Sequence, residues 1–170
     1  MDRKPCWFCT LLLVGGAGSA LPATVGHNSN KQPDRQFIRS VAIADMTEAH
    51  MAEMAQNNAS ASAVKDFGGT LDKEDLDEYG QLSALAGKAG TTIPKGIKAS
   101  GNPSIQALTK RKGAQFDRSF LRSEIADEQK MISMLDAEAA HGANADIKAW
   151  AEKTSAARKQ ELEKARALAK

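Results

Sequence analysis

The sequence predicts an all-α protein, and the fold class that we expect is a four-helix bundle made of two antiparallel helical hairpins joined by a longer linker. Two observations lead to this expectation. Only 5% of the 170 residues are aromatic, and alanine, lysine, glutamate, glutamine, leucine and methionine dominate the second half, a composition typical of helices. Apolar residues also recur at helical spacing in four long stretches, while no stretch alternates as a strand does.

The first 23 residues have the pattern of a cleavable signal peptide. Residues 2–4 carry a net positive charge, residues 6–14 form an apolar run, and small residues follow up to Ala20 and Ala23, the two cleavage sites that we expect. The apolar run is too short to cross a bilayer stably. The N-terminus therefore predicts export, and a mature chain without cysteine fits a bacterial periplasm.

After the signal peptide we expect a flexible leader over residues 24–33 and one helical domain over residues 34–170. The two cysteines, Cys6 and Cys9, fall inside the segment that is removed. Their spacing therefore cannot serve redox chemistry or zinc binding in the folded domain. The remaining chain is long enough to bury a core without disulfides.

Capping residues divide this domain into helices. Asp34 is the expected N-cap of the first long helix, Ser60 or Ser62 of the second, Asn102 of a short helix and Asn144 of the last long helix. The expected helices cover about 34–58, 62–88, 104–111, 114–140 and 145–170.

The connections between these helices predict how they pair. Short connections join the first helix to the second and the third long helix to the fourth, so each pair should form an antiparallel hairpin. The longer connection over residues 90–104 joins the two hairpins. Within the second helix, Gly68 and Gly69 predict either a kink or a close approach to another helix.

Acidic residues lie on the apolar face of every long helix, which is the least expected feature of the sequence. A buried ionised carboxylate costs several kcal/mol unless a cation or a proton compensates it. Carboxylates from facing helices are the arrangement that binds di-iron and di-manganese centres in helical bundles. The candidate metal ligands are Glu48, Asp75, Glu78, Glu124, Glu128 and Glu161.

Two interpretations of these acids stay open. In the first, they bind a divalent metal, for which Mn, Fe, Ca and Mg are the candidates because hard cations prefer oxygen ligands. In the second, they form ion pairs with Arg158, Arg118 or nearby lysines, or they lie at the ends of the bundle where water reaches them. Carboxylates that converge at mid-bundle favour the first interpretation, and acids spread to the ends contradict it.

Other kinds of site find little support in the sequence. The net charge is +2 and basic residues are interspersed with acidic ones, so we expect no nucleic-acid partner. His50 falls on the polar side of its helix, and His141 lies at a helix C-terminus where the helix dipole favours a cation. No Ser/His/Asp or Cys/His set and no glycine-rich phosphate loop is present. Methionines at helical spacing are more often core residues than metal ligands.

Several short motifs resemble a family of exported bacterial proteins, catalogued as domain of unknown function 4142. Residues 37–55, 63–67 and 90–94 are similar to the first half of that family. Residues 116–121, with the sequence FDRSFL, resemble its FD-x-x-[YF]-[LI] signature, and residues 126–130 and 147–154 follow in the expected order. The resemblance extends over nearly the whole mature chain and rests on the order and spacing of these motifs.

This resemblance implies an exported, ferritin-like four-helix domain of unknown activity. The family carries histidines near the positions that align with Asp75, Glu128 and Glu161, where this chain has acids, while Glu48 matches a family glutamate. A site made only of carboxylates would favour Ca, Mg or Mn over Zn or Cu. Redox chemistry on iron is less favoured without an imidazole ligand.

The sequence supports two main functional hypotheses. The first is a non-enzymatic periplasmic bundle with a structural, stress-related or interaction role, as a homo-oligomer or as a component of the cell envelope. The second is a ferritin-like metal-binding protein that uses the six acids named above. A third hypothesis is association with an envelope surface through the lysine-rich segment 90–113.

Overall fold

Residues 32–170 are described by the computed structural model, and over this range the prediction of an all-helical protein is confirmed. Five α-helices and a 3₁₀ turn at Ala99–Gly101 make up this part of the chain, without a strand. The predicted signal peptide lies outside the described residues, and so does the predicted leader except for Gln32 and Pro33. The helices are α1 (Gln32–Asn58), α2 (Ser62–Lys88), α3 (Pro103–Thr109), α4 (Gly113–His141) and α5 (Ala145–Leu168).

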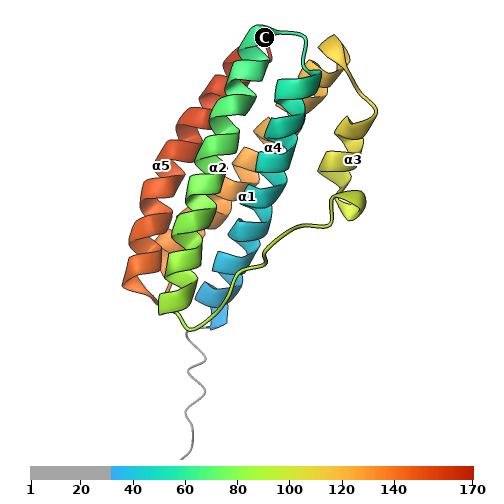
Figure 1. Cartoon of the computed structure of the whole chain (residues 1–170). Helices are drawn as coiled ribbons and strands as arrows, with labels where there is room; N and C mark the ends of the chain where they lie inside the picture. The colour runs from blue at the N-terminus through green and yellow to red at the C-terminus, as the bar shows by residue number, and fades with distance from the viewer. Residues whose placement is uncertain (1–31) are drawn as a thin grey trace, which may run out of the picture.

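The four long helices lie side by side, and the short α3 covers the outside of α1 and α4 (Figure 1). The connection between α1 and α2 meets the start of α4 through Asp117, at what we call the Asp117 end of the molecule. The start of α1 meets the connection between α4 and α5 through Asp34, at the opposite end. Helices α1 and α5 therefore run toward the Asp117 end, and α2 and α4 run away from it.

The apolar core is divided into two clusters along the length of the helices. One cluster, toward the Asp117 end, contains Met51, Phe67, Phe116 and Phe120. The other, toward the Asp34 end, is built around Trp150 and its neighbours. Because each long helix contributes to both clusters with a gap in between, the middle of the core is left to polar side chains.

Two of the predicted N-caps are confirmed. The side chain of Asn102 accepts hydrogen bonds from the backbone N–H groups of Ser104 (2.9 Å) and Ile105 (3.2 Å) at the start of α3. Asn144 does the same for Asp146 and Ile147 at the start of α5. Each side chain thus satisfies backbone donors that have no partner within the helix.

The predicted caps of the first two long helices are wrong, because tertiary contacts replace them. Helix α1 begins at Gln32, so Asp34 lies in its first turn, and its carboxylate accepts the backbone N–H of Ala143 at 2.9 Å. Helix α2 begins at Ser62 without a side-chain cap. There Asp117 accepts the backbone N–H groups of Ser60 (2.9 Å) and Ala61 (3.1 Å).

The Gly68-Gly69 pair marks a close approach of two helices, one of the two outcomes that the sequence predicts. A Cβ atom built on Gly68 would lie 2.8 Å from the backbone oxygen of Ala52 and 2.9 Å from the Cβ of Ala55. A side chain therefore has no space at this point of contact between α1 and α2. Among the described residues, no helix has the length and apolarity that crossing a membrane requires.

Candidate functional site

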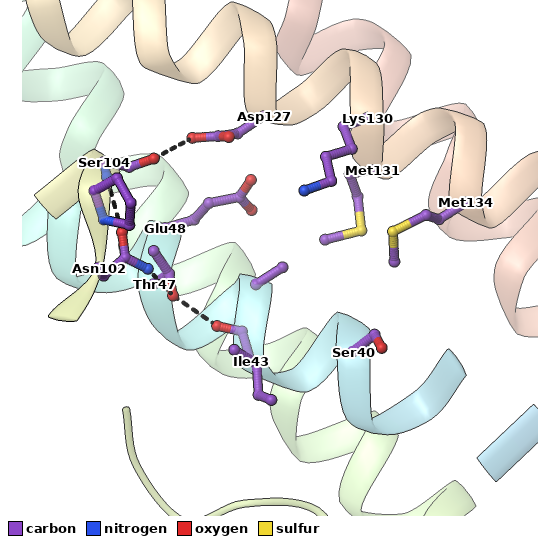
Figure 2. Close-up of a pocket in the computed structure, with 12 residues that line it drawn as sticks. Ser40, Ile43, Thr47, Glu48, Asn102, Ser104, Asp127, Lys130, Met131 and Met134 are labelled. Atoms are coloured by element: carbon purple, nitrogen blue, oxygen red, sulfur yellow. Dashed lines mark hydrogen bonds between the residues drawn. The ribbon is translucent and has the colours of Figure 1, made fainter. Parts of the chain in front are cut away.

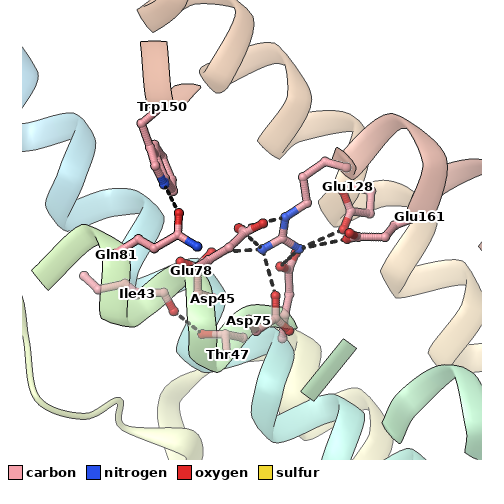
Figure 3. Close-up of polar contacts among 11 residues, drawn as sticks. Ile43, Asp45, Thr47, Asp75, Glu78, Gln81, Glu128, Trp150 and Glu161 are labelled. Carbon is pink, nitrogen blue, oxygen red and sulfur yellow. Dashed lines mark hydrogen bonds and ion pairs between the residues drawn. The ribbon is translucent and has the colours of Figure 1, made fainter. Parts of the chain in front are cut away.

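Arg158 lies at the centre of the polar middle layer and is almost completely buried, with 1% of its surface exposed. Its guanidinium group lies within 4 Å of carboxylates from all four long helices (Figure 3). The guanidinium–carboxylate distances are 3.1 Å to Asp45, 2.8 Å to Glu48, 2.7 Å to Asp75, 2.8 Å to Glu78, 2.9 Å to Glu128 and 3.5 Å to Glu161. The planar fork of arginine, with five N–H donors, suits such a cluster better than the single ammonium of lysine.

Glu124 belongs to the same cluster but has no hydrogen-bond partner. It is fully buried, and neither of its carboxylate oxygens is paired. It lies one helical turn from Glu128 on α4. One oxygen each of Asp45, Asp75, Glu128 and Glu161 also lacks a hydrogen bond. The cluster thus has more acceptor oxygens than the arginine can satisfy.

The charges of the cluster do not balance if every carboxyl group is ionised. Arg158 is the one buried base among the described residues, and seven buried carboxyl groups surround it: Asp45, Glu48, Asp75, Glu78, Glu124, Glu128 and Glu161. Burial acts to lower the pKa of Arg158, but the surrounding carboxylates outweigh burial and raise it, so the guanidinium stays charged. One positive charge cannot neutralise seven negative charges, so the cluster needs protons or additional cations.

Burial and mutual repulsion favour the protonated forms of these acids. Burial raises the pKa of Glu124 well above its ordinary value, and the neighbouring charges of Glu48 and Glu128 raise it further. The pKa of Asp75 rises well above its ordinary value for the same reasons. Burial, with the charge of Glu48, raises the pKa of Glu128 to about 9, although Arg158 acts in the opposite direction.

The cluster consists of two successive layers along the helix axis. Each long helix contributes two residues one turn apart, and the helix directions establish which residue of each pair lies nearer the Asp117 end. The layer nearer that end, which we call the four-carboxylate layer, contains Glu48, Asp75, Glu124 and Glu161. The other, which we call the arginine layer, contains Asp45, Glu78, Glu128 and Arg158.

Two surface pockets reach the cluster from different sides. One is a half-open cavity of about 530 Å³ between α1, α4 and the start of α3, and Glu48 points into it together with Asp127 and Lys130 (Figure 2). The other is a smaller cavity of about 120 Å³ between α2 and α5, lined by Glu78 and Glu161. Both layers of the cluster are therefore within reach of small solutes.

The structure brings together all six acids that the sequence singled out, at mid-length of the helices, and it also pairs five of them with Arg158. Sequence reasoning missed Asp45, which lies on the same face of α1 as Val41 and Glu48 and is buried. Asp45 is four residues after Val41 and three before Glu48, and this helical spacing could have identified it as a residue of the buried face. Oxygens of Asp45, Glu48 and Asp75 lie within 4.8 Å of one another, close enough to share one ion.

The two histidines of the described residues lie apart from this cluster. His50 lies 3.8 Å from Glu53 on the partly exposed side of α1, and His141 is the last residue of α4. The methionines Met131 and Met134 line the larger pocket, where Met131 also belongs to the apolar core (Figure 2).

Comparison with known proteins gives a family and a set of similar folds. The model of a family described as a domain of unknown function (DUF4142) matches residues 19–168. Among curated proteins there is no match. A DUF305 fragment from Deinococcus radiodurans has a similar structure, with a TM-score of 0.71 and 14% sequence identity over 81% of this chain and 95% of that one.

Two further structures share the fold. CopM in its Cu(II)-bound form has a TM-score of 0.68 and 17% identity, covering 80% of this chain and 95% of CopM. A DUF305 protein described as secreted, from Streptomyces coelicolor, has a TM-score of 0.68 and 11% identity, covering 79% of this chain and 90% of that one. At these identities the similarity establishes the fold and leaves the function to the residues of the site.

Proposed function

Because this chain belongs to the family described as a domain of unknown function (DUF4142), we propose that it is an exported protein of the cell envelope. In this proposal its four long helices form a ferritin-like bundle that has a non-enzymatic structural or interaction role. The pattern of the first 23 residues and the fold shared with a DUF305 protein that is described as secreted support export.

One observation carries this proposal: the guanidinium of Arg158 contacts carboxylates from all four long helices. A protein cation thus occupies part of the volume where related architectures place metal ions. This contact ties the hairpin of α1 and α2 to the hairpin of α4 and α5, because Arg158 belongs to the second hairpin and Asp45, Glu48, Asp75 and Glu78 to the first. Contacts that join the two hairpins in this way stabilise the folded protein, as a structural role requires.

Two measurements test this proposal. Cell fractionation, with the mass of the mature protein, should place the chain outside the cytoplasm and cleaved after Ala20 or Ala23. An uncleaved cytoplasmic protein contradicts export.

The second measurement tests the structural role. Arg158→Met should lower the free energy of unfolding, measured by urea denaturation, by about 3–5 kcal/mol, because it leaves buried carboxylates without their cation. Arg166→Met is the matched control, since Arg166 pairs with Glu163 on the exposed surface, and should cost less than about 1 kcal/mol.

A second candidate function is metal binding by the carboxylate cluster. The observation that favours it is the set of buried oxygens without a hydrogen-bond partner, next to the three oxygens of Asp45, Glu48 and Asp75. CopM, which shares the fold, is known in Cu(II)-, Cu(I)- and Ag-bound forms. Because the cluster of this chain offers oxygen ligands, Mn, Fe(II), Ca and Mg suit it better than copper does.

Thermal unfolding of the mature protein tests metal binding. An ion that binds only the folded state must raise the Tm once its concentration exceeds the Kd. We expect a rise with a hard divalent cation, and Glu48→Gln or Glu128→Gln should reduce it. If no metal changes the Tm, metal binding is refuted, and the structural role stands alone.

A further inference from the structure

We infer that the cluster has two cation positions, that Arg158 fills one of them, and that the four-carboxylate layer binds a single hard divalent cation through Glu48, Asp75, Glu124 and Glu161. This inference rests on the second candidate function and specifies its site, its stoichiometry and the class of its ion. Each of the four ligands comes from a different long helix.

The main observation behind this cation position is the environment of Glu124. It is fully buried, and both of its oxygens lack a hydrogen-bond partner, whereas every other acid of the cluster has at least one oxygen near Arg158. A buried carboxylate without a partner costs free energy and persists only where something compensates it. The charges of Glu48, Glu128 and Glu161 raise the pKa of Glu124 while that of Arg158 lowers it, and Glu124 forms no ion pair with Arg158.

Two other members of the layer, Asp75 and Glu161, each have an oxygen without a hydrogen bond. Asp75 contacts the guanidinium through Oδ1 at 2.7 Å, and its Oδ2 is unpaired. In Glu161 the oxygen without a hydrogen bond is Oε2, the same atom that lies 3.5 Å from the guanidinium. Glu48 contacts it through Oε2 at 2.8 Å. The two oxygens of Glu124, with these free oxygens, provide ligands that a divalent cation prefers.

The charge of the two layers explains why one ion is expected and not two. The guanidinium contacts all three acids of the arginine layer, Asp45, Glu78 and Glu128, and would repel a metal ion there at short range. It also contacts Glu48 and Asp75 of the four-carboxylate layer, at 2.8 and 2.7 Å, but it leaves Glu124 without a partner. The four-carboxylate layer has no base of its own. A divalent ion there adds two positive charges where the excess of negative charge is largest.

The pockets provide access to this position. Glu48 lines the larger pocket and Glu161 the smaller one, so two ligands of the layer face solvent-connected cavities on different sides of the molecule. The smaller pocket is also acidic, since Glu74 and Asp77 line it. This acidic opening favours the arrival of a cation over that of an anion. A soft ion is disfavoured, because the four ligands are carboxylates.

Equilibrium dialysis with Mn²⁺, read out by the paramagnetic resonance of the free ion, tests this inference on the mature protein. We expect one Mn²⁺ per chain in the parent. Glu124→Gln should weaken binding by about tenfold or more, because loss of a supporting group alone costs a metal site that much. Glu138→Gln is the matched control: Glu138 is also a buried glutamate of α4 with an unpaired oxygen, but it lies outside the cluster, and this variant should bind as the parent does.

The outcomes separate the inference from the function on which it rests. If the parent binds Mn²⁺ and Glu124→Gln binds it equally well, this position is refuted while metal binding stands. If the parent binds none, both are refuted. Two bound ions per chain also contradict the inference, because Arg158 would then not fill a cation position. Circular dichroism checks that Glu124→Gln is folded, and Asp75→Asn replaces it in the same assay if it is not.

Discussion

At the scale of single residues, Arg158 shows how one side chain can unite four helices. Burying a guanidinium is costly, and the structure offsets this cost with direct contacts to six carboxylates. The excess of acid around it is the unusual feature, because the attraction of each carboxylate to Arg158 is partly cancelled by repulsion from the others. Protons or a metal ion must complete the balance of charge.

Asp117 is a second residue whose role depends on a distant contact. Burial acts to raise its pKa, but the hydrogen bonds from Ser60 and Ala61 outweigh burial and lower it. Its oxygens accept both of these backbone N–H groups and the Ser60 hydroxyl. Asp117 thus acts as an N-cap for α2 that is supplied from another helix.

We predict that Asp117→Ala lowers the free energy of unfolding by about 1–2 kcal/mol, the usual cost of losing a helix cap. Denaturation in urea measures this change. The control is Asp66→Ala, which removes an exposed aspartate near the start of the same helix, where no cap depends on it, and should change stability by less than about 0.5 kcal/mol. Equal stability of the two variants would mean that the contact with Ser60 does not support α2.

At the scale of helices, the contact between α1 and α2 depends on small residues. Gly68 faces the backbone of Ala52 and the side chain of Ala55, both fully buried, so the two helix backbones approach closely at this point. A glycine within a helix is unfavourable for the isolated helix. The close approach explains why α2 has one here, since any larger residue would separate the helices.

We predict opposite effects for two glycine substitutions in α2. Gly68→Ala should destabilise the protein by about 1–3 kcal/mol, because the new methyl group would overlap Ala52 and Ala55. Gly80→Ala should stabilise it by about 0.5–1 kcal/mol, because nothing lies within 4 Å of the added Cβ and alanine favours a helix. Thermal and urea unfolding of both variants measures the difference, and a stabilising Gly68→Ala would contradict the close approach.

At the scale of the whole molecule, a polar layer separates two apolar clusters. Each apolar cluster contains residues of all four long helices, and the contacts of Arg158 join the same helices between the two clusters. A further buried pair of acids, Asp34 and Glu138, lies at the opposite end from Asp117. Burial raises the pKa of Glu138 to about 7, and the nearby charge of Asp34 raises it as well, while Lys148 lowers it.

These raised pKa values make global stability depend on pH. A carboxyl group whose pKa is raised in the folded state contributes stability fully below its unfolded pKa of about 4.5, and this contribution is lost as the pH rises through the folded pKa. For Glu138 that loss extends from about pH 4.5 to about pH 7, and for Glu128 from about pH 4.5 to about pH 9. We therefore predict that the free energy of unfolding decreases from pH 5 to pH 9 in the absence of metal.

Urea denaturation at unit steps of pH measures this profile. Glu138→Gln, which keeps the shape of the side chain and removes its titration, should make the decrease below about pH 7 shallower and leave the decrease from pH 7 to pH 9 in place. A metal-free protein that grows more stable between pH 5 and pH 9 would contradict the raised pKa values of Glu128 and Glu138.

The long helices, two of the N-caps and the acids on the apolar faces could be predicted from the sequence alone, because they depend on residues close together in the chain. Helical spacing of apolar residues identified the four long helices, and Asn102 and Asn144 cap their helices through backbone groups two and three residues away. The six acids on the apolar faces were likewise visible from periodicity, since a position on a helix face follows from spacing.

Tertiary structure alone decided which charges meet. Arg158 contacts Asp45 across 113 residues of chain and Glu128 across 30, and Asp34 reaches Ala143 across 109. Spacing within one helix carries no information on the direction, rotation and height at which another helix packs against it. For that reason the sequence placed Asp34 and Ser60 as local caps and left Arg158 as one of several partners, whereas helix packing joined these residues to side chains far along the chain and placed one arginine among seven acids.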